Sequence, residues 1–242
     1  MSATAADLVI AAIAGAIGAR GLAHVALTGG SSASGLYRAL REPSRVDAVD
    51  WSRVHLWFGD DRVVPLDDAD SNAGLALREL LTPADTPVAR ATIHPMLAGI
   101  DASAPNAAVV AATRYAAEIA VMPTDDDGDP VFDLLLLGMG PDGHVLSVFP
   151  GSAALSSEAP LVVAIPAPTH IKPELPRVTL HPAVIGAARS VLLMVGGAAK
   201  ATVVFDVLEE DPAIETYPAR LARIDTATWL LDPSCAGGLV LR

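Results

Sequence analysis

The sequence predicts an α/β protein built on a mostly parallel sheet with helices on both faces. Apolar segments of strand length alternate with helical patterns along the chain, which is typical of βαβ units. Several of the strand segments run directly into glycine-rich turns. Hydrophobic residues make up 52% of the 242 residues, enough for a large buried core. We therefore expect residues 1–242 to form a single domain.

The N-terminal half predicts two strands and four helices. The first 21 residues are alanine-rich, contain Asp7 and have no basic segment before them, so they predict an amphipathic helix rather than a signal peptide. The next apolar segment ends in two glycines and two serines, which are typical of a strand that runs into a helix start. Strands are expected over residues 24–28 and 53–59, and helices over residues 33–41, 71–81 and 105–122.

The C-terminal half predicts four strands and two helices. An acidic turn at residues 124–130 precedes a leucine-rich segment that is expected to be a central strand; we interpret its acids as a solvated loop rather than a calcium site. Strands are expected over residues 131–137, 161–165, 190–195 and 226–231, and helices over residues 182–188 and 198–209.

Composition and charge narrow the classes of partner. The formal charge is −12, and the chain has only two lysines, Lys172 and Lys200, which argues against nucleic acid binding. Beyond the N-terminal segment, no uninterrupted apolar run reaches membrane-spanning length. Cys235 is the only cysteine, and no Cys/His cluster has the spacing of zinc ligands. We expect a cytoplasmic protein without metal, membrane or nucleic acid, present as a monomer or weak homodimer.

The loop after the leucine-rich strand carries the most informative chemistry. It places Asp142 and His144 at the C-terminal end of a buried strand, where open α/β sheets bind ligands. The spacing Gly138-x-Gly140-x-x-Gly143 also fits a dinucleotide-binding fingerprint. That fingerprint requires a long helix directly after the third glycine, whereas Pro150-Gly151 interrupts the chain here. We therefore do not expect a dinucleotide site.

Four other segments fall at strand ends on the same side of the predicted sheet. Gly29, Gly30 and Ser31 lie between a strand and a helix, where backbone amides and hydroxyls suit an anion; the alternative is a turn with a serine N-cap. The strand that ends near residue 59 continues into Asp60 and Arg62, with Asn72 ten residues further. Two prolines flank the segment before Arg177, and Lys200 lies just after Gly196-Gly197.

Five segments together resemble the 6-phosphogluconolactonase family. Residues 28–37 resemble its TGGSTP-type loop, and residues 59–72 resemble its GDERxVPxxxxxSN stretch. Residues 138–151 are similar to GxGxDGHTASLFPG, residues 173–180 to PPxxRITL, and residues 196–201 to GxxKA. The chain departs from the family where Asp61 replaces Glu, Val145-Leu146 replaces Thr-Ala and Val148 replaces Leu, and its N-terminus is about one strand shorter than is common.

The resemblance implies a deaminase/isomerase-type three-layer sandwich, Rossmann-like in topology. It also implies hydrolysis of 6-phospho-D-glucono-1,5-lactone, the second step of the oxidative pentose phosphate pathway, with no metal or organic cofactor. In that reaction His144 is the natural general base, since histidine ordinarily titrates near neutral pH. Asp142 or Asp60 orients the imidazole or the water, and Arg62 stabilises oxyanion charge or holds sugar hydroxyls. The expected substrate-binding residues are Gly29, Gly30, Ser31, Asn72, Gly140, Arg177 and Lys200.

Two alternatives remain open at this point. Glucosamine-6-phosphate deaminases share the fold and the GxGxDGH core, but typically follow it with an IAFNEP-like stretch. Arg62 and Phe149-Pro150 favour the lactonase. The other alternative is a non-catalytic sugar-phosphate sensor that kept the binding loop, against which the presence of both His144 and Arg62 argues.

Overall fold

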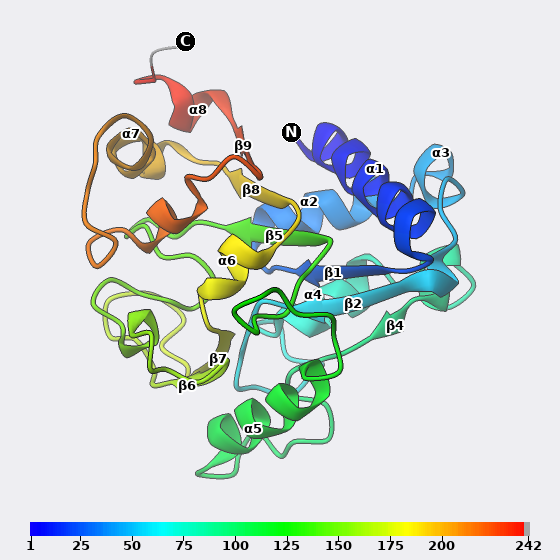
Figure 1. Cartoon of the computed structure of the whole chain (residues 1–242), viewed down its shortest axis with the longest axis horizontal. Helices are drawn as coiled ribbons and strands as arrows, with labels where there is room; N and C mark the ends of the chain where they lie inside the picture. The colour runs from blue at the N-terminus through cyan, green and yellow to red at the C-terminus, as the bar shows by residue number, and fades with distance from the viewer. Residues whose placement is uncertain (240–242) are drawn as a thin grey trace.

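The computed structural model describes residues 1–239 and contains a six-stranded sheet in which every pair is parallel (Figure 1). Its spatial order is β4-β2-β1-β5-β8-β9. The strands are β1 (Ala23–Leu27), β2 (Val54–Phe58), β4 (Thr92–Ile93), β5 (Leu134–Gly138), β8 (Val191–Val195) and β9 (Ala227–Leu231). Five of the six expected strands therefore belong to this sheet, and the two-residue β4 was not expected.

A second sheet, of three antiparallel strands, corrects the placement of the remaining expected strand. The segment expected over residues 161–165 forms β6 (Val162–Ile165), which pairs with β7 (Arg177–Leu180) instead of joining the parallel sheet. On its other side β7 pairs with β3 (Asp60–Arg62). The apolar pattern of β6 does not distinguish a strand of the large sheet from one of this smaller sheet.

Helices and the small sheet cover the two faces of the parallel sheet. Figure 1 shows α1 and α2 above it, and α5 and the β6–β7 pair below it. The helices are α1 (Ser2–Arg20), α2 (Ser31–Leu40), α3 (Pro43–Val46), α4 (Asn72–Glu79), α5 (Ala107–Ile119), α6 (Ala183–Ala187), α7 (Ala201–Glu209) and α8 (Pro233–Ala236). The 3₁₀ helices are η1 (Trp51–Arg53), η2 (Pro87–Arg90), η3 (Ala153–Leu155), η4 (Ala198–Lys200) and η5 (Pro218–Ala222). This layered arrangement is the expected α/β fold.

Helix α1 combines an apolar sequence with one buried side. Within the described chain it is the one helix long and apolar enough to cross a membrane by length and composition. Ala5, Val9, Ile13 and Ala16 nevertheless lie in the core, at the spacing of one helix face. The helix ends at Gly21, whose φ of 82° gives a left-handed C-cap. In this structure α1 therefore acts as a covering helix of the sheet.

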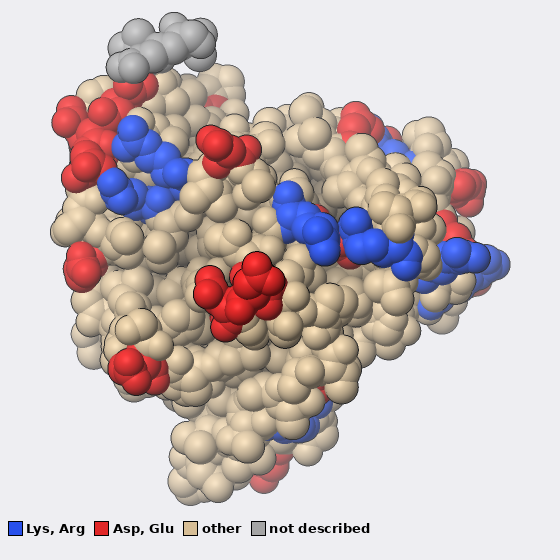
Figure 2. Space-filling view, viewed as in Figure 1, with Lys and Arg blue, Asp and Glu red and all other residues tan. Residues whose placement is uncertain are grey.

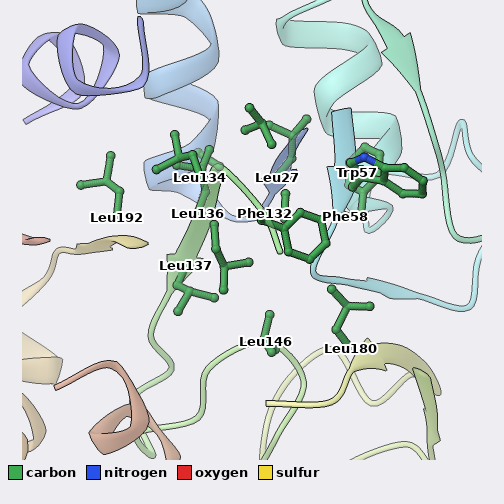
Figure 3. Packing of buried hydrophobic residues seen from close by; sticks show 14 of the residues in the cluster. Leu27, Trp57, Phe58, Phe132, Leu134, Leu136, Leu137, Leu146, Leu180 and Leu192 are labelled. Atoms are coloured by element: carbon green, nitrogen blue, oxygen red, sulfur yellow. The ribbon is translucent and has the colours of Figure 1, made fainter. Parts of the chain in front are cut away.

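The core continues from the parallel sheet into the layer below it. Phe58 and Leu137 are fully buried on neighbouring parts of the large sheet. In Figure 3, Leu146 and Leu180 lie between the lower layer and these strands. Leu180 also donates its backbone N–H to the carbonyl of Gly59 at 2.9 Å, which attaches β7 to the end of β2. One continuous core thus joins both sheets among the described residues, while the single domain over residues 1–242 stays a prediction.

The strand order creates a switch point between β1 and β5. From β1 the chain proceeds outward to β2 and β4 on one side, whereas β5, β8 and β9 follow on the other side. Open α/β sheets bind ligands outside the carboxyl ends of the strands at such a point. The loop after β1 contains Gly29 and Gly30, and the loop after β5 contains Asp142 and His144. The topology therefore brings the two glycine loops to one edge of the sheet.

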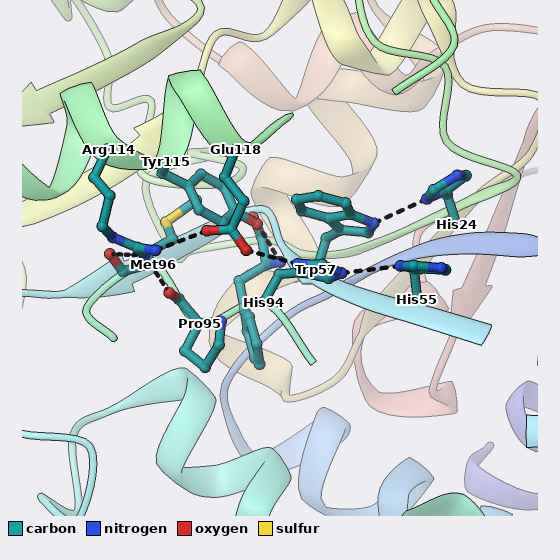
Figure 4. A network of polar contacts seen from close by, with 10 residues as sticks. His24, His55, Trp57, His94, Pro95, Met96, Arg114, Tyr115 and Glu118 are labelled. Atoms are coloured by element: carbon teal, nitrogen blue, oxygen red, sulfur yellow. Dashed lines mark hydrogen bonds and ion pairs between the residues drawn. The ribbon is translucent and has the colours of Figure 1, made fainter. Parts of the chain in front are cut away.

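A buried histidine cluster lies away from this edge, near the beginnings of β1 and β2 (Figure 4). Trp57 Nε1 donates to His24 Nδ1 at 3.0 Å, and the Trp57 ring stacks on His94 with centroids 3.7 Å apart. His94 Nε2 lies 3.0 Å from His55 Nδ1, and its Nδ1 lies 2.6 Å from Glu118 Oε1. Burial lowers the pKa of His24 to about 4 and also lowers the pKa of His55. Neutral imidazoles at His24 and His55 therefore fit this network.

Candidate active site

A cavity of about 210 Å³ opens where the carboxyl ends of the strands meet. Its walls come from the loops after β1, β2, β5 and β8 and from the start of β7. The cavity contains every residue expected at the site except Asp142, which lies behind His144. Those lining residues are Gly29, Gly30, Ser31, Asp60, Arg62, Asn72, Gly140, His144, Arg177 and Lys200. Segments that are distant in the sequence therefore converge as expected.

Asp142 and His144 form a carboxylate–imidazole pair. Asp142 Oδ1 lies 2.5 Å from His144 Nδ1. Burial opposes ionisation of Asp142, but the hydrogen bond and charge of His144 outweigh burial and hold the pKa of Asp142 at about 2. The ionised carboxylate accepts the Nδ1 proton, which leaves the lone pair of His144 on Nε2. The pair thus has the geometry of an oriented base.

Two glycines allow this pair to form. A Cβ on Gly140 would lie 2.1 Å from His144 Nδ1 and 2.6 Å from Asp142 Oδ1, so no larger residue fits beside the ring. Gly143 has a φ of +78°, a conformation that L-residues rarely adopt. After Gly143 the chain forms no helix before Pro150, so the helix required by a dinucleotide fingerprint is absent from this described segment. The two glycines therefore allow the His144 imidazole to pack directly against the backbone of its own loop.

The chain after His144 is held against the small sheet. Leu146 has a φ of 55°, which is uncommon for a residue other than glycine. Ser147, fully buried, donates from Oγ to Asp60 Oδ2 at 2.5 Å and from its backbone N to Thr179 Oγ1 at 3.1 Å. These bonds fix the loop after β5 relative to β3 and β7. Sequence analysis did not identify Leu146 or Ser147 as site residues.

Asp60 lines the cavity but does not pair with the imidazole. Its carboxylate accepts from Ser147 and, at 3.3 Å, from Asn72 Nδ2, which also donates to the Asp60 carbonyl at 2.9 Å. Of the two acids expected to orient His144, the structure brings Asp142 to the ring and directs Asp60 to other partners. Asp60 is 94% buried, because only 6% of its surface is exposed. Its place in the cavity wall leaves it available to a bound molecule.

Asp61 anchors the start of α4 beside the site. Its carboxylate accepts from the backbone N–H groups of Asn72 at 2.6 Å and Ala73 at 3.0 Å. Burial raises the pKa of Asp61 to about 6, although these bonds oppose the shift. The anchored helix presents Asn72, whose Oδ1 accepts from Arg62 Nη1 at 2.9 Å. Asp61, which stands where the family pattern has Glu, therefore still holds Asn72 in place, and Asn72 in turn positions Arg62.

Two arginines, one buried and one partly buried, face the cavity from adjacent strands. Arg62 on β3 and Arg177 on β7 are register partners in the antiparallel pair. Arg177 has only 2% of its surface exposed, and its Cζ lies 5.4 Å from the centroid of the Phe149 ring. Burial lowers the pKa of Arg177, although Asp60 and other nearby carboxylates oppose this shift. In the described structure the Nε atoms of both arginines are buried without hydrogen-bond partners, and two guanidinium groups with such free donors suit an anionic ligand.

Another part of the cavity wall combines a helix N-terminus with a lysine. Gly30 is the N-cap of α2, with φ 89°, and Ser31 begins the helix. A Cβ on Gly29 would lie 1.8 Å from Asn72 Oδ1, so this wall packs tightly on the Asn72 side chain. Lys200 ends η4 directly before α7, and burial lowers its pKa. Backbone amides and an ammonium group together favour a phosphate or carboxylate.

Phe149 and His170 are neighbours of the pair that sequence analysis did not include in the site. The Phe149 ring lies 4.7 Å from the His144 ring, between centroids, and contacts His170 edge-on at 5.6 Å. His170 Nε2 lies 3.0 Å from Asp142 Oδ2. Phe149 belongs to the Phe149-Pro150-Gly151 end of the loop that resembles the family motif, so the sequence did contain a signal for its place at the site. No sequence pattern indicates His170, because it lies 28 residues from Asp142 in a proline-containing connection.

Sequence comparison identifies relatives over nearly the whole chain. A 6-phosphogluconolactonase of Mycobacterium leprae is 39% identical over 224 residues, which are 93% of this chain and 88% of the relative. The solved structure of 6-phosphogluconolactonase from Leishmania guyanensis superposes with a TM-score of 0.81 at 30% identity, covering 100% of this chain and 97% of that one. A monomeric glucosamine-6-phosphate deaminase matches with a TM-score of 0.72 at 21% identity, a likeness of fold alone. Residues 1–230 match the family described as glucosamine-6-phosphate isomerases/6-phosphogluconolactonase, and the chain belongs to this family.

Proposed function

We propose that this protein hydrolyses 6-phospho-D-glucono-1,5-lactone to 6-phosphogluconate, with His144 as general base. The observation that carries the proposal is the pair of Asp142 and His144 at a cavity that also contains Arg62, Arg177 and Lys200. Relatives with the lactonase name cover most of the chain at 34–39% identity. An oriented base and a cationic cavity match the two needs of a phosphorylated lactone, which are activation of water and retention of the phosphate.

The proposed chemistry is a base-assisted attack on an ester carbonyl. His144 Nε2 accepts a proton as water attacks the lactone carbonyl carbon, and negative charge develops on the carbonyl oxygen. An arginine beside the carbonyl stabilises this charge, a role for which Arg62 is positioned by Asn72. When the ring carbon–oxygen bond breaks, the imidazolium returns the proton to the leaving ring oxygen. Asp142 remains ionised throughout and stabilises the imidazolium.

The phosphate is proposed to bind at the cationic walls of the cavity. Backbone amides of Gly29, Gly30 and Ser31 at the start of α2, together with Lys200 and Arg177, provide donors for its oxygens. Asn72 and Gly140 complete the proposed substrate-binding residues. Binding the phosphate at a fixed place holds the lactone carbonyl at the base, which converts binding energy into orientation.

Partner and location remain predictions. On the face seen in Figure 2, Lys and Arg side chains lie in small groups beside acidic ones, with other residues between the groups. Together with the net charge of −12, this pattern supports a small-molecule substrate over nucleic acid. A monomer or weak homodimer in the cytoplasm, without a membrane partner, is the state we expect.

The test is an assay with freshly generated 6-phosphogluconolactone. Because the lactone also hydrolyses in water, the quantity to measure is the rate in excess of buffer. We expect saturable hydrolysis by the protein, and no release of ammonia from glucosamine 6-phosphate. Saturable binding of 6-phosphogluconate with no excess hydrolysis indicates the sensor alternative and contradicts the proposal. Ammonia release without lactone hydrolysis contradicts it in favour of a deaminase.

A further inference from the structure

The Asp142 carboxylate is shared by two imidazoles from different parts of the chain. Oδ1 lies 2.5 Å from His144 Nδ1, and Oδ2 lies 3.0 Å from His170 Nε2. His144 comes from the loop after β5, whereas His170 comes from the connection between β6 and β7. The proposed base and a second histidine therefore act on opposite oxygens of one carboxylate.

The His170 ring is placed by more than this one bond. It contacts the ring of Phe149 edge-on, and the same Phe149 ring packs against His144 at 4.7 Å. The side chain of His170 is 51% exposed, while those of Asp142 and His144 are 17% and 14% exposed. His170 thus lies at the solvent side of a packed group of three rings and one carboxylate.

Bonds to both oxygens fix a carboxylate more firmly than bonds to one. His144 contacts Asp142 through its backbone N–H at 3.3 Å and through Nδ1 at 2.5 Å, but both contacts meet Oδ1, and the terminal torsion of an Asp side chain is a broad, soft coordinate. The bond from His170 meets Oδ2 and holds the carboxylate plane so that Oδ1 stays directed at His144 Nδ1. That direction determines the tautomer and the orientation of the proposed base.

We propose that His170 is a positioning residue for the lactonase reaction, which acts through Asp142 on His144 and does not touch the substrate. This inference rests on the proposed function. It predicts an effect on kcat rather than on KM, because the phosphate-binding residues are untouched. It also predicts that a side chain that keeps an N–H donor at position 170 retains kcat, since the bond to Asp142 Oδ2 is what His170 supplies.

The experiment compares kcat and KM of His170→Ala and His170→Gln with those of the unchanged protein at pH 8. We expect His170→Ala to lower kcat about fivefold, the effect of one lost hydrogen bond, with KM within about twofold. His170→Gln is expected to recover kcat, because its amide N–H replaces Nε2–H.

The exposed neighbour Thr169 provides the control, and Thr169→Ala should leave kcat and KM unchanged. An unchanged kcat in His170→Ala overturns the inference, as does a kcat for His170→Gln as low as that for His170→Ala. An increase in KM without a change in kcat overturns it too, because that result places His170 in substrate binding. If the unchanged protein shows no excess hydrolysis, the proposed function itself fails, a result distinct from all of these.

Discussion

Arg62 and Arg177 are register partners across the antiparallel pair β3–β7, with both guanidinium groups at the wall of the same cavity. Like charges directly opposite each other in a sheet are destabilising. Burial adds to this cost and lowers the pKa of Arg177. The phosphate site proposed above would offset both costs, since an anion bound between the two guanidinium groups neutralises them.

Replacing Arg177 should therefore weaken substrate binding more than turnover. We expect Arg177→Ala to raise KM at least about tenfold, with a smaller change in kcat, because an interaction with the phosphate is equal in ground and transition states. Lys200→Ala should act in the same direction. Steady-state kinetics and competition by inorganic phosphate measure the effect. Arg53→Ala is the control, since Arg53 is 54% exposed and, among residues 1–239, its one ion pair is with exposed Asp50. A similar KM for all variants would argue against this anion site.

Loss of the Asp142 carboxylate should reduce turnover with little effect on binding. In the unchanged protein the ionised Asp142 carboxylate accepts the Nδ1–H of His144. Asp142→Asn replaces it with a neutral amide, which presents either an N–H donor or an uncharged oxygen to the ring, so the orientation and tautomer of His144 are no longer fixed. We expect kcat to fall about 10- to 100-fold and KM to change less than threefold. With the pKa of Asp142 at about 2, its carboxylate stays ionised above pH 4, so its own titration causes no loss of rate between pH 4 and 9. A normal kcat in the Asn variant contradicts the orienting role.

Gly140 should tolerate no side chain. A Cβ there would lie 2.1 Å from His144 Nδ1, so Gly140→Ala must displace the imidazole. We expect kcat to fall at least about tenfold while the circular dichroism spectrum stays that of the folded protein. Gly186→Ala is the matched control, because a Cβ at Gly186 meets nothing within 4 Å. Equal kinetics for the two variants would mean that the imidazole does not need this close approach.

The buried His24 should make the fold sensitive to acid. Burial lowers the pKa of His24 to about 4, so between pH 6.5 and 4 the unfolded chain takes up a proton that the native state does not. The free energy of unfolding should therefore fall as pH decreases through this window, with His24 responsible for about 2 kcal/mol of the loss between pH 7.5 and 5. His24→Asn removes the titration and keeps an acceptor for Trp57 Nε1.

Urea unfolding at the two pH values measures this contribution. The unchanged protein should lose about 2 kcal/mol more than His24→Asn between pH 7.5 and 5. His55, whose pKa burial also lowers, is present in both proteins, so the comparison removes its contribution except for the part that comes from its interaction with His24. Equal losses in the two proteins would show that His24 is able to take up its proton in the native state.

The sequence was sufficient to predict β1, β2, β5 and β8 and the loops that follow them, but not the short strands β3 and β7 that carry Arg62 and Arg177. Leucine-rich β5 and the glycines after β1 and β5 have patterns that follow from burial and backbone freedom. By contrast, β3 consists of Asp60, Asp61 and Arg62, and three charged residues give no strand pattern. Only long-range pairing with β7 makes this segment a strand.

The partners within the site were the least predictable part. Asp60 and Asp142 were equal candidates to orient His144, because spacing along the chain does not say which carboxylate reaches a ring. The hydrogen bond from Ser147 Oγ holds the Asp60 carboxylate, although the two residues lie 87 positions apart in the sequence. Asp142 is the carboxylate that contacts the His144 ring. His170 likewise meets Asp142 only because the connection before β7 folds over the loop.

The most direct test of the account is the turnover of His144→Ala, with His144→Gln as a variant of closer volume. Excess lactone hydrolysis over buffer is measured at saturating substrate and pH 8. We predict that kcat falls by about two to four orders of magnitude while KM stays within about threefold, as expected when a general base is lost and the phosphate grip is kept. Hydrolysis at the normal rate in both variants would contradict the assignment of His144 as the base.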